Sequence, residues 1–181
     1  MQKMIGIPPQ VSRGQGVKEL VEMQIEWKHP EKTLDELIGT LREGDLYEIS
    51  DAASRLGAWG ERAIPPLMQL LRDPDLNMRW RAAAAFVHVG KPAVPRLIKA
   101  LQEEDWPVRT AAIYALEQIG DRRAVPALIA ALHGKTMECR CMAAAALKKI
   151  GDPGGLAAMG RALDLERQGE RDYVEELTGR T

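Results

Sequence analysis

Apolar residues recur in the same arrangement three times between residues 63 and 150 of the 181-residue chain. Each copy opens with a short apolar line that carries a proline near its start, at residues 63–71, 93–101 and 124–132. The leucine and isoleucine positions in each line have the i, i+3, i+4 spacing of one helix face. Proline is tolerated in the first turn of a helix, where its missing N–H has no partner to lose. Each line therefore predicts a short helix.

A second helix is predicted after each of these lines, beyond a short polar turn. Its inward positions combine two alanines with larger apolar residues, as in Met78, Ala82, Ala85, Phe86 and Val89. Alanine on a packed face lets two helix axes approach to the short end of a range of roughly 8–10 Å. Gly90, Gly120 and Gly151 follow these helices, where a left-handed residue ends a helix at low cost. The repeated unit is thus predicted to be a pair of helices closed by a glycine.

The repeat is regular in length. Pro65, Pro95 and Pro126 recur at spacings of 30 and 31 residues, and the closing glycines keep the same spacings. Self-similarity at this period indicates a stacked array of helix pairs, so we expect an all-α fold without a β-sheet. We expect a single domain over residues 17–181, and after its first helix the units follow at about 33–60, 61–90, 91–120, 121–151 and 152–181.

The two ends of the array are predicted to differ from its middle, because terminal units must expose one polar surface. Residues 1–16 predict a flexible leader, and residues 17–30 predict an amphipathic helix that caps the stack. The first unit has Ile49 where later units have an arginine. The last unit is predicted to be a truncated helix pair, with Val174 and Leu177 on a short and charged second helix.

Charge and composition argue against several classes of function. The 25 basic and 26 acidic residues give a net charge of −1, which provides no electrostatic attraction to nucleic acid or to an anionic membrane. No apolar run has transmembrane length, and the N-terminus lacks the apolar core of a secretory signal. Cys139 and Cys141 point about 200° apart on one predicted helix, so they are poorly placed for a disulfide. We expect a cytoplasmic protein with reduced thiols.

The units resemble the short HEAT-like repeats that are named after the phycobilisome lyases. The pattern Ala-Val-Pro-x-Leu-Ile-x-x-Leu is followed by an acidic turn, by Val108-Arg109, by an alanine run and by Ile119-Gly120. The resemblance covers about residues 33–177. It implies an armadillo-type fold, a right-handed α-solenoid whose concave face is lined by the second helices. Such arrays serve mainly as scaffolds, so the resemblance is specific for the fold and weak for the function.

An arginine stands near the start of the second helix in four successive units. These residues keep the repeat spacing and form a ladder of Arg79, Arg109, Arg140 and Arg171. A row of guanidinium groups can bind phosphate or carboxylate groups of a ligand. One arginine at a fixed register in each unit is also what a structural bond to the preceding turn requires. We favour the structural interpretation, in which each arginine bonds turn carbonyls and a turn acid such as Asp105.

Aromatic side chains on the outward side of the second helices mark a candidate binding surface. Trp80 and Tyr114 fall one helical turn apart in register on consecutive second helices, so they are predicted to straddle a shallow cleft. The predicted partner-binding residues of the concave face are Trp80, Arg81, His88, Tyr114, Glu117 and Gln118, and Thr110 and Ala111 are also predicted to point outward. Aromatic groups inside a polar rim are typical anchors of protein-binding surfaces. The alternative is that the two rings pack on the edge of a neighbouring helix or on the N-terminal leader.

Catalytic and metal-binding patterns are absent from the sequence. His29, His88 and His133 lie in different units, and the spacing of Cys139 and Cys141 is not that of a zinc site. The di-iron hydroxylases built on HEAT-like repeats carry His-Glu pairs, and this sequence has none. Neither a glycine-rich phosphate loop nor a nucleophile elbow is present. We therefore expect no metal and no cofactor, and we favour a protein that is not an enzyme.

Three functions remain open on this reasoning. The favoured one is a non-enzymatic scaffold or adaptor that binds another protein or a peptide on the concave face. The second, implied by the resemblance, is the handling of a bilin or another planar cofactor, with Trp80, Arg81 and Tyr114 beside the ligand. Against the second, no cysteine or acid pair is evidently placed for transfer, and the lyases usually act with a partner subunit. Recognition of DNA is the third, and the balanced charge argues against it.

Overall fold

The computed structural model describes residues 32–178, with the side chains of the last helix included up to Gln168 except that of Glu166. The chain divides into two units, Met1–Thr33 and Leu34–Thr181, and the second unit holds nearly all of the described residues. The predicted leader over residues 1–16 and the predicted helix over residues 17–30 lie outside the described residues.

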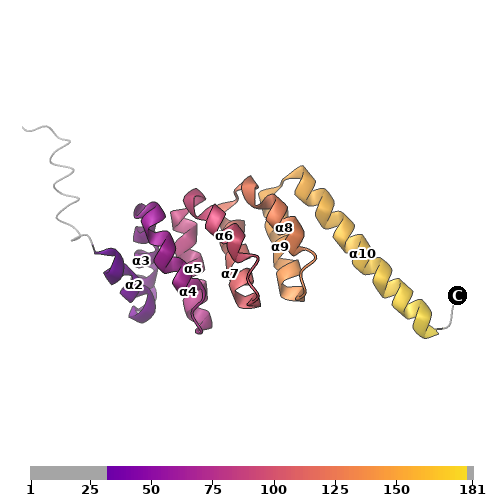
Figure 1. The fold of residues 1–181 in the computed structure, drawn as a ribbon, viewed down its shortest axis with the longest axis horizontal. Coiled ribbons are helices and arrows are strands. Elements are labelled where there is room, and N and C mark those ends of the chain that lie inside the picture. The colour runs from indigo at the N-terminus through magenta and orange to yellow at the C-terminus, as the bar shows by residue number, and fades with distance from the viewer. Residues whose placement is uncertain (1–31, 179–181) are drawn as a thin grey trace, which may run out of the picture. The chain divides into compact units, whose positions relative to one another are not determined.

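Four pairs of helices follow one another along the second unit (Figure 1). The pairs are α2 (Leu34–Glu43) with α3 (Leu46–Ala58), α4 (Ile64–Leu71) with α5 (Leu76–Val89), α6 (Val94–Ala100) with α7 (Trp106–Ile119), and α8 (Val125–Ala131) with α9 (Met137–Ile150). Short 3₁₀ helices lead into α4, α6 and α8, namely η1 (Gly60–Ala63), η2 (Lys91–Ala93) and η3 (Arg122–Ala124). The described residues contain no strand. The prediction of an all-α solenoid is therefore confirmed.

The second helices of the pairs form one closely packed row. α3 packs on α5, α5 on α7 and α7 on α9, whereas each first helix packs mainly on the second helix of its own pair. Most contacts thus run within a pair or between neighbouring pairs, as in a one-dimensional array. We call the surface formed by α3, α5, α7 and α9 the second-helix face. We call the side on which the two helices of each pair are joined the loop edge.

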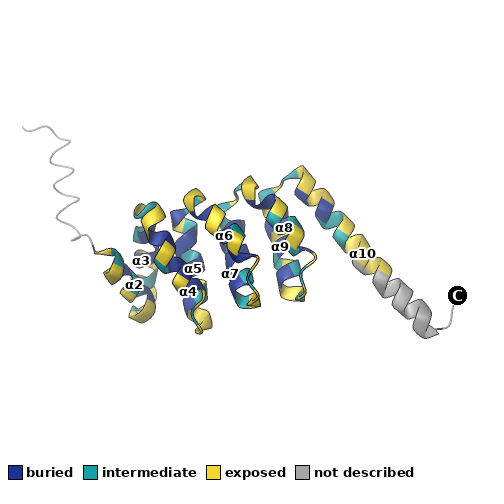
Figure 2. Cartoon of the chain, in the orientation of Figure 1, coloured by how far each residue is buried: buried dark blue, intermediate teal, exposed yellow. Residues whose placement is uncertain are grey.

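Alanine at one register of each second helix accounts for the close packing. The four equivalent residues have at most 1% of their surface exposed, namely Ala52, Ala82, Ala112 and Ala143. Phe86 fills the space one turn further along α5 and is fully buried. Figure 2 shows the buried positions alternating with exposed ones along each helix, as the apolar pattern predicts. The inward register of these alanines is therefore confirmed.

Glycine ends α7 and α9 where the backbone enters the left-handed region. Gly120 has a φ of 69° and Gly151 a φ of 68°, a conformation that any side chain disfavours. The N–H of Gly120 donates to the Leu116 carbonyl at 3.0 Å, and that of Gly151 to the Leu147 carbonyl at 3.1 Å. These bonds close the last turn of each helix, so the glycine fixes where the next unit begins.

The last unit differs from its prediction. Instead of a truncated helix pair, the chain forms one continuous helix, α10 (Pro153–Thr178). Between Leu163 and Arg171 the sequence has one glycine, Gly169, and no proline, and it is rich in glutamate, arginine and glutamine, which favour helix. A single interior glycine costs about 1 kcal/mol, which does not break a helix of this composition. α10 contacts α8 and α9 near its start and then runs away from the row (Figure 1).

Candidate functional site

The two aromatic residues of the predicted surface contact each other across the row. Trp80 lies on α5 and Tyr114 on α7, and their ring centroids are 5.4 Å apart at an interplanar angle of 83°. This edge-to-face geometry contributes about 0.5–1.5 kcal/mol beyond the area that the rings bury. Trp80 keeps 37% of its surface exposed, and Tyr114 is half-buried. The prediction that the rings straddle a cleft was wrong, because they lie close enough to form one aromatic pair.

Arg81 reaches from the same helix to the end of the first pair. Its Nη1 donates to the Leu41 carbonyl at 2.8 Å and to the Arg42 carbonyl at 3.0 Å. These carbonyls lie in the last turn of α2, where the helix leaves acceptors unpaired and a positive charge is favoured. Arg81 therefore helps to join the first and second pairs. Its Nε and Nη2 make no hydrogen bond within the described residues.

The other predicted surface residues lie further toward the C-terminal ends of the second helices. Lys149 on α9 donates to Gln118 Oε1 at 2.5 Å and lies 3.8 Å from Glu117 Oε1. His88 is exposed near the end of α5. Lys149 was not among the predicted binding residues, although it stands one repeat after Gln118, 31 residues on. The repeat register nevertheless predicts that Lys149 faces outward on its helix, and the structure has it exposed.

The outward stripe of α7 is narrower than predicted. Thr110 has 3% of its surface exposed and Ala111 1%, so the prediction that they point outward was wrong. The Thr110 hydroxyl donates to the Pro107 carbonyl at 3.0 Å, a local bond that satisfies the group without water. Both positions are covered because α7 packs between α5 and α9, which leaves only a narrow outer side. Tyr114, Glu117 and Gln118 remain on that side.

The ladder arginines bond the turns that precede them. Arg79 Nε donates to the Asp73 carbonyl at 2.5 Å, and Arg109 Nη1 to the Glu103 carbonyl at 2.7 Å. Arg140 Nη1 donates in the same way to the Gly134 carbonyl at 3.2 Å. In each case the acceptor lies six residues earlier, on the loop edge. The side chain of Arg171 lies outside the described residues.

Ion pairs on the loop edge link the first three pairs of helices. Arg42 bonds Asp73 at 3.0 Å, and Arg72 bonds Glu103 at the equivalent positions one repeat later. The hydrogen bond from Arg72 holds the pKa of Glu103 below its usual value. Arg79 reaches Asp105 of the next pair at 3.0 Å. Arginine and acid at these registers thus tie each of the first three pairs to its neighbour.

Groups that could hold a metal or react as nucleophiles are few in the described part of the chain. No three His, Cys, Asp or Glu side chains there lie close enough together to bind a metal ion. Cys139 is buried and Cys141 exposed, and neither forms a disulfide. None of the described helices combines the length and apolar character that crossing a membrane requires.

Comparison with known proteins agrees with the repeat period. A family model described as HEAT repeats matches residues 34–117 and again residues 94–177, so its two overlapping matches span most of the chain. The description is of HEAT repeats in general and does not single out the phycobilisome-lyase type. No curated protein matches the chain.

Proposed function

Because the chain belongs to the HEAT repeat family, we propose that it is a non-enzymatic scaffold whose second-helix face binds another protein or a peptide. HEAT repeats are commonly scaffolds for protein interactions. The observation that carries the proposal is the pair of Trp80 and Tyr114 on this face, with Trp80 37% exposed in a chain that has only 4% aromatic residues. Exposure of a large indole to water is unfavourable, and the cost is removed when a partner covers the ring.

The geometry of the aromatic pair suits binding with little loss of conformational freedom. Tyr114 packs edge-to-face on Trp80, so the indole is held in one orientation before a partner arrives. A side chain that is already ordered loses less entropy on binding than a free one, which costs about 0.5–1.5 kcal/mol to immobilise. The pair is therefore suited to act as a compact apolar anchor for a side chain of the partner.

Polar groups around the pair provide the rim that such a surface needs. Arg81 retains two guanidinium nitrogens, Nε and Nη2, for an acceptor on a partner. Lys149 with Glu117 and Gln118 supplies a mixed set of charges on the neighbouring helices. A rim of both signs favours a peptide or protein loop over a uniformly charged nucleic acid backbone. The general HEAT match does not favour the bilin-handling alternative.

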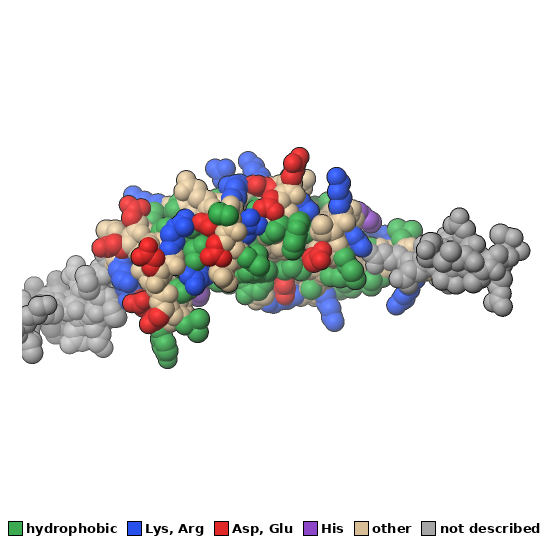
Figure 3. Space-filling view, turned by 90° about the horizontal axis from the view of Figure 1, so that it is seen from below, with side chains coloured by type: hydrophobic (Ala, Val, Ile, Leu, Met, Phe, Trp, Pro, Cys, Tyr) green, Lys and Arg blue, Asp and Glu red, His purple; other side chains and the backbone are tan. Residues whose placement is uncertain are grey.

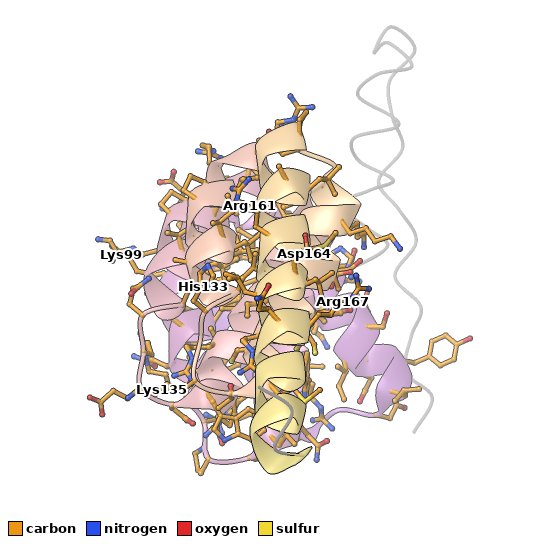
Figure 4. The ribbon with its side chains drawn as sticks, turned by 90° about the vertical axis from the view of Figure 1, so that its right-hand side faces the viewer. Lys99, His133, Lys135, Arg161, Asp164 and Arg167 are labelled. Carbon is orange, nitrogen blue, oxygen red and sulfur yellow. The ribbon has the colours of Figure 1, made fainter. Side chains whose placement is uncertain are left out.

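Photo-crosslinking from single positions tests this proposal. A photoreactive phenylalanine analogue replaces Trp80 in one variant and Lys99 in another, and each protein is irradiated in an extract of its native host. Lys99 is an exposed residue of α6, a first helix, and provides the matched control (Figure 4). We expect a discrete adduct from position 80 and none from position 99. Adducts from position 99 alone, or none from either position, would contradict the second-helix face as the binding surface.

A further inference from the structure

The junction between the third pair (α6 and α7) and the fourth pair (α8 and α9) departs from the two junctions before it. A cavity of about 620 Å³ lies there on the loop edge, between the turn over residues 101–106 and the turn over 134–136. This volume lies within the range of roughly 300–1,000 Å³ that is typical of ligand sites. Figure 3 looks onto the loop edge and shows hydrophobic side chains gathering toward the middle and the C-terminal part of the row. We call this cavity the junction groove.

The acids and bases that tie the earlier junctions together are replaced at this one. One repeat after the pair of Arg72 and Glu103, the equivalent positions hold Gln102 and Gly134, so neither the base nor the acid of that ion pair is present. The N-cap of α9 is Thr136, where α7 has Asp105. Both links that the second pair makes to the third are therefore missing between the third and the fourth.

Arg109 consequently lacks the carboxylate that its equivalent has. Arg79 bonds Asp105 of the next pair at 3.0 Å, whereas Arg109, one repeat later, faces the register of Thr136. Within the described residues Arg109 forms no ion pair, and Nη1 alone of its nitrogens is used, on the carbonyls of Glu103 and Glu104 at 2.7 Å each. The charge of a half-buried guanidinium group is thus left without a counter-ion in the junction groove.

A second, independent group in the groove also lacks a partner. The hydroxyl oxygen of Thr136 is buried and has no hydrogen-bond partner, and it does not cap α9. A buried hydroxyl without a partner is unfavourable by about 1–3 kcal/mol, so such groups are rare in folded proteins. Arg109 and Thr136 line the same cavity, and the guanidinium group of Arg109 can donate hydrogen bonds to a carboxylate that enters it.

The remaining residues of the groove define what accompanies the carboxylate. The charge of Glu103 is neutralised by Arg72, and the exposed charges of Glu104 and Lys135 are of opposite sign. The charge of Arg109 is therefore the one in the groove that has no opposite charge to offset it. Trp106 lines the groove with 45% of its surface exposed, and aromatic side chains are frequent anchors for apolar groups. We propose that the junction groove binds an acidic side chain of a partner polypeptide together with an adjacent apolar residue. The carboxylate takes the place beside Arg109 that Asp105 takes beside Arg79.

A peptide library provides the first test, with the full-length protein as bait. The probe is a set of heptapeptides blocked at both ends, with Glu, Asp, Gln or Asn fixed at the centre and the other positions randomised. We expect peptides with a central acid to be enriched at least tenfold over those with the matching amide, with apolar residues beside the acid. Equal recovery of acids and amides would overturn the proposal.

Two variants of one residue locate the binding. Thr136→Asp restores the carboxylate of the earlier junction, so it is expected to pair with Arg109, to raise the melting temperature and to weaken the selected acidic peptide at least tenfold. Thr136→Asn has the same shape without the charge and is expected to keep the wild-type affinity. Equal binding by the two variants would contradict the site, as would loss of the peptide in a Trp80→Ala, Tyr114→Ala protein, which places it on the second-helix face instead.

Discussion

Arginines of the second helices show which side-chain hydrogen bonds can be predicted from the repeat spacing and which cannot. The fixed register of the arginines predicts a bond to the preceding turn, and the structure places each described ladder arginine on a carbonyl six residues earlier. The bond from Arg81 to the end of α2, 40 residues away from Leu41, has no such signature. A long flexible side chain can reach several carbonyls, and only the packed helices decide which one it meets. We propose that the ladder is structural.

Arg109→Ala tests that role. The change leaves the carbonyls of Glu103 and Glu104 without their donor. Mutational studies assign about 1.5–3 kcal/mol to a hydrogen bond that involves a charged group. We expect the free energy of unfolding in urea to fall by about 2 kcal/mol. Arg96→Ala is the control, because Arg96 is exposed on α6 and makes no hydrogen bond or ion pair within the described structure. Equal stability of the two variants would show that the ladder is not structural.

Asp121 gives a pH-dependent prediction. The side chain and the backbone N–H of Arg123 bond its carboxylate and lower its pKa from 3.8 to about 2. Because the pKa is lower in the folded state, the stabilisation is full above the unfolded pKa of about 3.9 and is lost as the pH falls toward 2. The difference in melting temperature between wild type and Asp121→Asn is expected to be constant above about pH 5 and to shrink to a small fraction of that value as the pH falls to 2. A difference that is as large at pH 2 as at pH 6 would refute the charge-based explanation.

Among the elements, the helix pairs could be predicted and the final helix could not. Proline near the start of α4, α6 and α8 and glycine after α5, α7 and α9 are local signals, so they determine the pairs directly. In the last unit the register continues as far as Arg171, but the turn residues do not. Where the α8–α9 turn has Gly134 and the N-cap Thr136, the last unit has Leu165 and Arg167, so the helix-favouring composition prevails and α10 stays continuous.

The alanine register of the second helices makes a prediction about packing. Ala112 is fully buried where α7 meets its neighbours, so a larger side chain has no space there. Ala112→Leu is expected to lower the free energy of unfolding by about 1–3 kcal/mol, the usual result of overpacking. The same change at the exposed Ala145 of α9 is expected to have little effect. An Ala112→Leu protein as stable as wild type would mean that the helices are less closely packed than described.

At the scale of the whole molecule, the row of second helices brings together side chains that are distant in sequence. Register arithmetic placed Trp80 and Tyr114 on adjacent helices, but it could not show their contact, because the approach of two helices depends on the small residues between them. The interrupted links at the third junction were visible as substitutions at Gln102, Gly134 and Thr136. Their consequence is an open groove, which could not be predicted without the three-dimensional structure.

The aromatic pair is the centre of the proposed binding surface, and removing both rings tests it most directly. The double variant Trp80→Ala, Tyr114→Ala is compared with the single variant Tyr47→Ala, which removes a 90% exposed ring of α3 that is not part of the pair. Loss of the ring contact destabilises by about 0.5–1.5 kcal/mol plus lost burial, so a melting temperature a few degrees below wild type is expected.

The crosslinking experiment from position 80 identifies the partner. The deciding measurement is how much of that partner each purified variant retains. Our account predicts that the double variant keeps its helical content and loses the partner, while Tyr47→Ala retains it. A folded double variant that retains the partner as well as wild type would contradict the account.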